Sequence, residues 1–371
     1  MRIVLAGGGT AGHVNPLLAT AQVLRERGAE VVALGTAEGL EADLVPAAGI
    51  DLVTIPRVPL PRRPSPALLT LPMRLGQAVS ACTAALEGAD ALVGFGGYVS
   101  TPAYLAARSA KIPVIIHEQN ARPGLANRLG ASWAKVVALT FSSTPLAAKT
   151  GATVTTGLPL REAIVDLARA RRDGHGNTRR VEAAARLGLN PDAPTLVVTG
   201  GSLGAVHINE CVTSAAQYLP EGAQVLHLTG RGKDGVVREA VRAAGLEQRW
   251  TILDYLVTME DALACADLVL CRSGAGTVAE MTALGLPCVY VPLPIGNGEQ
   301  RLNASDHVEA GGAIMVDDKD LTADIVENRI FPLLVSQDLA SMADASANLG
   351  HIEAATELAD LVMEAATEGK A

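Results

Sequence analysis

Aromatic residues and long apolar runs are scarce in this chain of 371 residues. Aromatics make up only 3% of the residues, hydrophobic residues 49% and charged residues 19%, which is typical of a soluble globular protein rich in Ala, Val, Leu and Gly. No stretch reaches the roughly 18 uninterrupted apolar residues of a membrane-spanning helix. The chain begins with a short apolar run that leads straight into glycines, unlike a signal peptide. We therefore expect no signal peptide and no membrane span, whereas peripheral contact with a membrane stays compatible with the sequence.

Paired cysteines and an excess of basic charge are absent too. The five cysteines are odd in number and form no C-x-x-C pair, so we interpret them as reduced core residues of a cytosolic protein. They are Cys82, Cys211, Cys265, Cys271 and Cys288. The 30 Lys and Arg residues against 39 Asp and Glu residues give a net charge of -9, which argues against a nucleic-acid-binding protein.

What the chain does contain is a regular alternation of short apolar runs with helical patterns, which is typical of a parallel sheet covered by helices on both faces. The predicted strand cores are residues 2–6, 30–34, 51–55, 91–93, 113–116, 136–139, 154–155, 195–199, 224–229, 250–253, 268–271, 288–291 and 313–316. A Gly-rich turn follows both the first run and the run at 195–199, which is a weak internal repeat. The predicted fold class is therefore α/β, with two Rossmann-like domains in tandem whose parallel sheets face each other across a cleft.

The length of the chain suits two domains. We place the first at residues 1–159 and the second at 160–349, and we expect the C-terminal helix, about 350–371, to pack back on the first. Two polar segments are predicted to be solvated. The run 171–180 breaks a helical pattern and is interpreted as an insertion, and Asp317 to Asp320 (DDKD) is interpreted as a turn and N-cap rather than a metal site.

The segment Gly7 to Gly12 fits the pattern G-x-G-x-x-G, which on its own is weak evidence. A dinucleotide site also needs an acid near the end of the second strand, and here Glu38 comes only beyond that end. We therefore favour binding of a phosphate by the backbone of the turn over a nicotinamide cofactor. His13 opens the following helix and is a candidate proton acceptor for an alcohol, with a structural histidine as the alternative.

Polar and glycine residues also follow other predicted strands. The segment 94–100 (GFGGYVS) is either a site where a ligand approaches the backbone or a simple turn with a Ser N-cap. The segment 117–120 (HEQN), with Asn127, either builds a hydrogen-bond network or faces a ligand, and we favour the ligand. The stretch Cys271 to Asn303 places two strand ends beside two helix starts, an arrangement that suits an anionic, diol-bearing ligand such as a nucleotide-sugar.

Four arginines, Arg57, Arg62, Arg63 and Arg74, lie among prolines and leucines at residues 57–75. Cations beside exposed apolar residues suit an anionic membrane surface. A Pro-rich loop followed by an ordinary amphipathic helix is the alternative.

Six motifs together resemble those of the MurG family, the N-acetylglucosaminyltransferases that make lipid II in bacterial peptidoglycan synthesis. In chain order they are residues 8–13 (GGTAGH), 94–98 (GFGGY), 117–120 (HEQN), 200–205 (GGSLGA), 272–280 (RSGAGTVAE) and 298–300 (GEQ) with Asn303. The resemblance covers nearly the whole chain. It implies a GT-B fold, an inverting mechanism, no cofactor or metal, and a peripheral location on the cytoplasmic face of the cell membrane.

The implied partners are UDP-GlcNAc, the acceptor lipid I (undecaprenyl-diphospho-MurNAc-pentapeptide), the anionic inner leaflet and other cell-wall synthesis proteins, which connects the activity to cell shape and cell division. By resemblance, Glu280 binds the ribose hydroxyls, the backbone of Leu256 meets uracil, and Ser202 and Arg161 face the diphosphate. Ala275, Gln300 and Asn127 contact the GlcNAc hydroxyls. His13 is the leading catalytic base and Glu118 the second. The substrate-binding set is Thr10, Ala11, Gly12, Asn127, Arg161, Ser202, Leu256, Ala275, Glu280, Glu299 and Gln300, and the acceptor side is Gly96, Gly97 and Tyr98.

The chain departs from the family pattern at three places. The family often has Gly at the position of Ala11, can have Gln-Gln in place of Glu299 and Gln300, and commonly has Gly-Asn-Pro-x-Arg where this chain has GLPLR ending at Arg161. Other functions that the same architecture could serve are a UDP-GlcNAc 2-epimerase, another GT-B glycosyltransferase and a non-catalytic nucleotide-sugar sensor.

Overall fold

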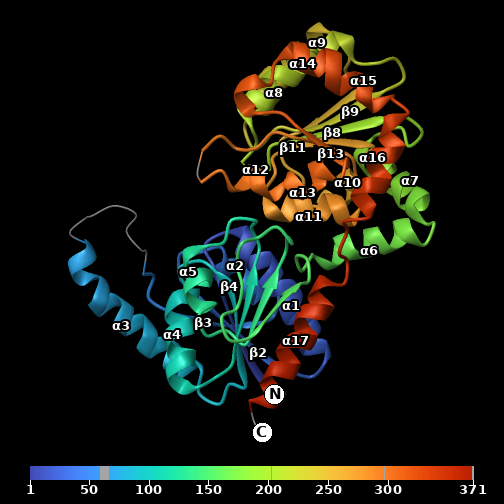
Figure 1. The fold of residues 1–371 in the computed structure, drawn as a ribbon. Coiled ribbons are helices and arrows are strands. Elements are labelled where there is room, and N and C mark those ends of the chain that lie inside the picture. Colours follow the sequence, from blue (N-terminus) through green and yellow to red (C-terminus); the bar gives the residue numbers. More distant parts are fainter. Residues whose placement is uncertain (59–66, 202, 296, 370–371) are drawn as a thin grey trace. The chain divides into compact units, whose positions relative to one another are not determined.

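The computed structural model describes residues 1–58, 67–201, 203–295 and 297–369, without the side chains of 67–69 (Figure 1). The chain divides into two compact units. Unit 1 is Met1–Arg161 together with His351–Ala371, and unit 2 is Glu162–Gly350. Each unit is a parallel sheet covered by helices, so the predicted α/β fold class with two Rossmann-like domains is confirmed.

Unit 1 contains a seven-stranded sheet in the order β3-β2-β1-β4-β5-β6-β7. Its strands are β1 Arg2–Gly7, β2 Glu30–Gly35, β3 Asp51–Thr54, β4 Ala91–Gly96, β5 Val114–Glu118, β6 Val136–Leu139 and β7 Ala152–Thr155. Its helices are α1 Ala11–Glu26, α2 Glu41–Ala47, α3 Ala67–Ala85, α4 Ser100–Ala110, α5 Leu125–Gly130 and α17 Ala354–Glu368. The described strand pairs are all parallel, with Leu5 of β1 level with Ala33 of β2 and Val93 of β4.

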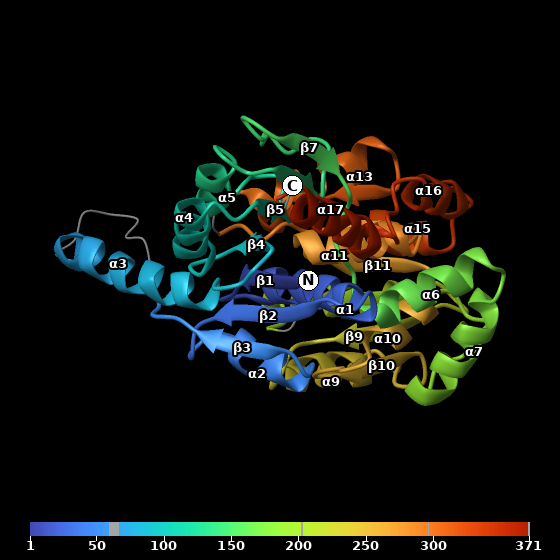
Figure 2. The ribbon, with the colours of Figure 1, turned by 90° about the horizontal axis from the view of Figure 1, so that it is seen from below.

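The side chains of β1 alternate between two cores, because successive residues of a strand point to opposite faces. Ile3 and Leu5 belong to a core shared with α1, α2 and α17, whereas Val4 and Ala6 belong to a core shared with α3, α4 and α5. Figure 2 shows α17 beside α1, on the side away from α3 and α4. The last helix of the chain therefore completes a core that the first strand begins.

Unit 2 contains a six-stranded sheet in the order β10-β9-β8-β11-β12-β13. Its strands are β8 Thr195–Thr199, β9 Gln224–Leu228, β10 Trp250–Leu253, β11 Leu268–Cys271, β12 Cys288–Tyr290 and β13 Ala313–Met315. Its helices are α6 Glu162–Arg172, α7 Gly176–Leu187, α8 Val206–Ser214, η1 Ala216–Tyr218, α9 Asp234–Ala243, α10 Met259–Cys265, α11 Ala275–Ala283, α12 Glu299–Asn303, α13 Ser305–Glu309, η2 Asp318–Asp320, α14 Ala323–Ile325, η3 Val326–Ile330, α15 Phe331–Leu334 and α16 Asp338–Ala347. One face of the sheet packs on α8, α9 and α15, and Figure 1 shows α10, α11 and α13 on the other face.

The run 171–180 is mostly exposed, as predicted, but it is not an insertion. It forms the end of α6, a short turn and the start of α7. Arg171 donates to the carbonyls of Leu263 (2.8 Å) and Leu284 (3.1 Å), which lie near helix ends. Arg180 forms a two-point ion pair with Asp267 (2.9 and 2.8 Å) just before β11. The arginines thus satisfy buried acceptors of distant segments, which a local charge run does not reveal.

Two further findings concern the cysteines and membrane-spanning helices. All five cysteines are buried and none is in a disulfide. Among the helices in the described part of the chain, none is long and apolar enough to cross a membrane.

Candidate active site

The carboxyl ends of β1 and β4 form the switch point of unit 1, where the chain leaves β1 in one direction and later returns on its other side. Ligands of open α/β sheets bind at such points. Unit 2 has the same arrangement at β8 and β11. Three helices, α1, α8 and α11, begin beside these strand ends. In the described structure, no side chain caps the N-terminus of any of the three, which leaves their first N–H groups to be satisfied by water or a ligand.

His13 is the third residue of α1 and is only partly buried. Its Nδ1 atom lies 2.9 Å from the hydroxyl of Thr10, the N-cap residue. A Cβ atom on Gly96 would lie 3.2 Å from the Nε2 atom of His13, so the imidazole faces the turn after β4. Burial lowers the pKa of His13, and the Gly8 carbonyl and the Glu41 carboxylate act in the opposite direction. The net shift keeps the ring neutral at neutral pH, which is the state a general base needs.

Glu118, at the end of β5, is 2% exposed and fully engaged. Its carboxylate accepts from the backbone N–H groups of Asn120 and Gly124 (both 3.0 Å) and from the amide of Asn127 (2.9 Å). Asn127 in turn accepts from the Tyr104 hydroxyl at 2.7 Å. Burial raises the pKa of Glu118, whereas these hydrogen bonds act in the opposite direction. The segment 117–120 therefore builds the hydrogen-bond network that was the alternative to facing a ligand.

Two glycine turns of unit 1 touch each other through their backbones. A Cβ atom on Gly97 would lie 2.4 Å from the Gly8 carbonyl oxygen, and Gly97 has a φ of +82°. Both the space and the backbone angle thus exclude other residues at Gly97. Ser100 links β1 and β4, because its hydroxyl accepts a hydrogen bond from the Gly96 N–H (2.9 Å) and donates one to the Ala6 carbonyl (3.0 Å). Ser100 is the first residue of α4 rather than its N-cap.

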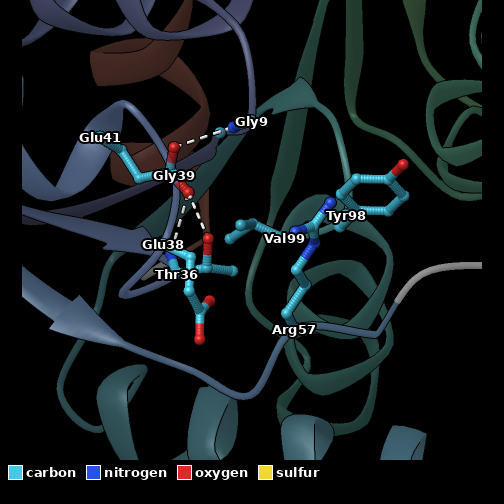
Figure 3. A pocket seen from close by; sticks show the side chains of 9 residues that line it. Gly9, Thr36, Glu38, Gly39, Glu41, Arg57, Tyr98 and Val99 are labelled. Carbon is cyan, nitrogen blue, oxygen red and sulfur yellow. Dashed lines mark hydrogen bonds between the residues drawn. The ribbon is translucent and has the colours of Figure 1, made fainter.

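A pocket opens beside these turns and is shown in Figure 3. Nine residues line it, namely Gly8, Gly9, Thr36, Glu38, Gly39, Glu41, Arg57, Tyr98 and Val99. On one side, the guanidinium of Arg57 lies over the ring of Tyr98 at 5.0 Å. Tyr98 is 40% exposed, so this wall offers a cation and a phenol to solvent.

The other wall of the pocket holds Glu41, the first residue of α2, which is 0% exposed. Its carboxylate accepts from the Gly9 N–H (2.8 Å), the Thr36 N–H (2.9 Å) and the Thr36 hydroxyl (2.8 Å). Glu41 is thus an acid close to the end of the second strand, but its carboxylate points toward the glycine turn after β1. A dinucleotide ribose would need that carboxylate to face outward, so the geometry disfavours a nicotinamide cofactor.

In unit 2 the turn 200–205 leads from β8 into α8, and 272–274 leads from β11 into α11. Ser202 lies outside the described residues. A Cβ atom on Gly204 would lie 2.1 Å from the Thr229 carbonyl oxygen, so this turn packs on the turn after β9. The hydroxyl of Ser273 is buried without a hydrogen-bond partner in the described structure, at the N-terminus of α11.

The segment Asp317–Asp320 is not simply solvated, and that interpretation was wrong for Asp318. The Asp318 carboxylate forms an ion pair with Arg272 and lies 3.3 Å from Nδ1 of His207, in the first turn of α8. Arg272 also donates to the carbonyls of Val291 and Pro292, where the chain leaves β12. Asp318 therefore connects the start of α8, the turn before α11 and the exit of β12. The described residues contain no group of three His, Cys, Asp or Glu side chains that could hold a metal ion.

Of the other predicted donor residues, five lie in unit 2, whereas Arg161 lies in unit 1. Leu256 follows β10, Ala275 opens α11, and Glu280 lies in the second turn of α11. Glu299 is exposed and Gln300 partly buried at the start of α12, and the side-chain amide oxygen of Gln300 accepts from the Leu293 N–H at 2.9 Å. Arg161 directly precedes α6 and is the last residue of the first segment of unit 1. On the acceptor side, Thr10, Ala11 and Gly12 form the start of α1.

Sequence reasoning missed Glu41, Arg57 with Tyr98 as a stacked pair, and Asp318. For Glu41 the signal was present, since an acid was expected near the end of the second strand, but it lies six residues beyond that end. The partners of Asp318 and Arg57 are Arg272 and Tyr98, which lie in distant segments, so no local sequence pattern predicts these contacts.

Two doubly wound units with switch points at β1/β4 and β8/β11 define the GT-B class of glycosyltransferases. The family model for the "Glycosyltransferase family 28 N-terminal domain" matches residues 3–139, and that for the "Glycosyltransferase family 28 C-terminal domain" matches residues 195–362. The chain therefore belongs to glycosyltransferase family 28 and, within it, to the MurG family.

Individual relatives agree with this assignment. The "UDP-N-acetylglucosamine--N-acetylmuramyl-(pentapeptide) pyrophosphoryl-undecaprenol N-acetylglucosamine transferase" of Bifidobacterium adolescentis is 49% identical over 363 residues, which cover 93% of this chain and 92% of that protein. The crystal structure of Acinetobacter baumannii MurG superposes with a TM-score of 0.80 at 29% identity, covering 98% of this chain and 99% of that one. The UDP-GlcNAc 2-epimerase of Neisseria meningitidis, bound to UDP-GlcNAc, has a TM-score of 0.69 at 15% identity and covers 98% and 100% of the two chains. The epimerase shares the fold alone.

Proposed function

We propose that this protein transfers GlcNAc from UDP-GlcNAc to the 4-hydroxyl of MurNAc in lipid I, with inversion at the anomeric carbon, and so forms lipid II. The observation that carries the proposal is the identity of 49% with a transferase of that name over nearly the full length of both chains. The uncapped starts of α8 and α11 support binding of the diphosphate and sugar of the donor to unit 2, with Glu280 on the ribose and Leu256 on the uracil. Gln300 and the Ala275 N–H then contact GlcNAc.

In the proposed mechanism, His13 of unit 1 is the general base. Thr10 accepts a hydrogen bond from Nδ1–H of His13, which leaves Nε2 to remove the proton of the MurNAc 4-hydroxyl as its oxygen attacks the anomeric carbon. The transition state is oxocarbenium-like, as in glycoside hydrolysis. The bond to UDP breaks in the same step, and helix N-termini with Arg161 stabilise the charge on the departing diphosphate. Glu118 and Asn127 act by holding the turn after β5, because their polar atoms are already paired.

A transfer assay with radiolabelled UDP-GlcNAc and a short-chain lipid I analogue tests the proposal. We expect labelled disaccharide product, and UDP release only when the acceptor is present. Conversion of UDP-GlcNAc without acceptor would instead indicate a 2-epimerase, and tight binding without turnover would indicate a sensor. Either result would contradict the proposed function.

We also propose that unit 1 docks peripherally on the cytoplasmic face of the cell membrane through residues 57–75. Of the residues behind this proposal, Leu60, Arg62 and Arg63 lie outside the described residues. In the described part of the segment, Met73 is 62% exposed and Arg74 donates to the Arg57 carbonyl at 3.0 Å. An exposed apolar side chain beside cations fits an anionic lipid surface.

Changing Arg57, Arg62, Arg63 and Arg74 together to Gln is expected to weaken binding to phosphatidylglycerol vesicles by at least tenfold, because each cation near such a surface contributes about 1 kcal/mol. Cosedimentation with the vesicles measures the bound fraction of each variant. The matched control changes four exposed arginines of unit 2, Arg172, Arg179, Arg242 and Arg329, and so lowers the net charge equally. Equal loss in both variants, or no loss in the first, would contradict the membrane proposal.

Asp318 is expected to matter for donor binding, since it connects the segments around the proposed diphosphate site. Asp318→Asn should raise the KM for UDP-GlcNAc about tenfold, or about 1.4 kcal/mol, with little change in the KM for the acceptor. Steady-state kinetics measure it. Asp320→Asn is the matched control, because Asp320 lies in the same turn and is exposed. An unchanged donor KM in Asp318→Asn would show that the ion pair does not position the site.

A further inference from the structure

The carboxylate of Glu41 is placed in an unusual way for an acid at the end of the second strand. It is 0% exposed, and three donors from two different segments occupy it, the Gly9 N–H and the N–H and hydroxyl of Thr36. Figure 3 shows these interactions, with Glu41 reaching from α2 to the glycine turn. A side chain so enclosed does not bind a ligand directly, so its effect must pass through the groups it holds.

The glycine turn is built around this carboxylate. A Cβ atom on Gly8 would lie 2.4 Å from one carboxylate oxygen of Glu41, and one on Gly39 would lie 2.1 Å from the other. No other residue at Gly8 or Gly39 leaves room for Glu41 in this position. On its other side, Gly8 contacts Gly97 through its carbonyl, and that carbonyl also acts on the imidazole of His13. The turn is thus held between Glu41 and His13.

We propose that Glu41 is a positioning residue of the transfer reaction, which fixes the turn Gly7–Thr10 that leads into His13 and supplies a carboxylate to the site of the imidazole. The inference rests on the proposed function of His13 as the base. Glu41 itself touches neither substrate nor the reacting atoms.

The charge on Glu41 is maintained by its partners. Burial raises the pKa of Glu41, but the hydrogen bonds from Gly9 and Thr36 lower it, and the net shift is downward. These hydrogen bonds therefore favour the ionised carboxylate. A fixed negative charge favours the protonated imidazole and makes the ring a stronger base.

Other charged groups surround His13 on different elements. Glu118 of β5 reaches toward it through Asn127, whose amide nitrogen would lie 3.6 Å from a Cβ atom on Gly96. Arg57, from the segment after β3, lies over Tyr98 at the far wall of the pocket. Of these two carboxylates, Glu41 is the one whose charge raises the pKa of His13, which makes its removal the informative change.

The test is the pH dependence of kcat/KM for Glu41→Gln, which keeps the shape of the side chain. We expect kcat to fall about 10²-fold, because small displacements of a catalytic group cost that much. We also expect the acidic limb of the profile to move to lower pH, since loss of the negative charge lowers the pKa of His13. The KM for UDP-GlcNAc should not change.

Asp43→Asn is the matched control. Asp43 lies in the same helix α2, is exposed, does not line the pocket and makes the same change in net charge, so its profile should coincide with that of the wild type. Gly39→Ala is a second variant that keeps every charge but displaces the Glu41 carboxylate, and it should shift the limb in the same direction. Thermal unfolding establishes whether each variant is folded. If Glu41→Gln does not fold, the pH profile of Gly39→Ala tests the inference instead.

The outcomes separate this inference from the function on which it rests. A lower kcat with an unmoved acidic limb would make Glu41 merely structural and overturn the inference, as would an unchanged kcat. If the wild-type protein transferred no GlcNAc to the lipid I analogue, the proposed function itself would be overturned. If His13→Ala retained full activity, the assignment of His13 as the general base would be wrong.

Discussion

His13→Ala is expected to lower kcat with saturating UDP-GlcNAc and lipid I analogue by about 10²- to 10⁴-fold, which is the usual contribution of a general base. The variant removes the ring that faces the Gly96 turn, whereas the network of Glu118 and Asn127 and the packing of Gly97 on Gly8 stay intact. The KM for UDP-GlcNAc should therefore stay close to that of the wild type. Single-turnover transfer measures the chemical step directly.

The matched control is His175→Ala, which removes an exposed histidine of unit 2. It should leave kcat within about twofold of the wild type, since a surface substitution away from the site is close to neutral. If His13→Ala kept a near-normal kcat, the base would have to be sought elsewhere, and Glu118→Gln would be the next variant to measure. Glu118 is already bonded to Asn120, Gly124 and Asn127, so we expect its replacement to lower stability more than the chemical rate.

Acidification from pH 7 to pH 5 is expected to remove about 6 kcal/mol from the free energy of unfolding. Three buried histidines cause the loss, because burial lowers the pKa of His117 and His307 to about 4 and that of His227 to about 3. Each stays neutral in the folded protein and gains a proton in the unfolded chain below about pH 6.5. Each histidine therefore costs about 2 kcal/mol over this range.

The sign follows from proton binding. Between about pH 6.5 and pH 4 the unfolded chain binds more protons, so stability falls as the pH falls. Glu118, whose pKa burial raises, acts in the opposite direction and offsets part of the loss. Urea unfolding between pH 5 and 8 measures the slope. Against a typical total of about 5–15 kcal/mol, such a loss brings the protein close to unfolding.

His227→Gln should flatten the pH slope of the stability, because the Asn209 oxygen that accepts from His227 at 3.0 Å can accept from an amide instead. A stability that stays level between pH 7 and 5 would contradict the assignment of neutral, buried histidines.

The fold could be predicted from the sequence because its signals are local and repeated. Apolar runs such as Ile3 to Ala6 and Leu268 to Cys271 are continuous, which is how strands buried on both faces appear. Glycine turns follow β1 and β8, so the glycine pattern alone indicates where the two switch points lie. The roles of the individual site residues remain predictions that kinetics must test.

What could not be predicted depends on partners far away in the chain. Asp318 looks solvated in the sequence, yet it pairs with Arg272, 46 residues earlier. Arg180 looks like part of a charged insertion, yet it pairs with Asp267. Glu41 looks like an ordinary helix-opening acid, and only the fold shows that Gly9 lies within hydrogen-bond distance. Each of these charges is specified by tertiary geometry, which overrides the local preference for solvent.

The position of α17 has a consequence for synthesis on the ribosome. Unit 2 is one continuous segment, Glu162–Gly350, and can fold as soon as it has emerged. Unit 1 is begun first but finished last, because Leu358 and Val362 of α17 fill the core beneath β1, β4 and β5. Until α17 has been synthesised, that apolar face has no cover, so the unit that holds His13 completes its core only after all of unit 2 has been made.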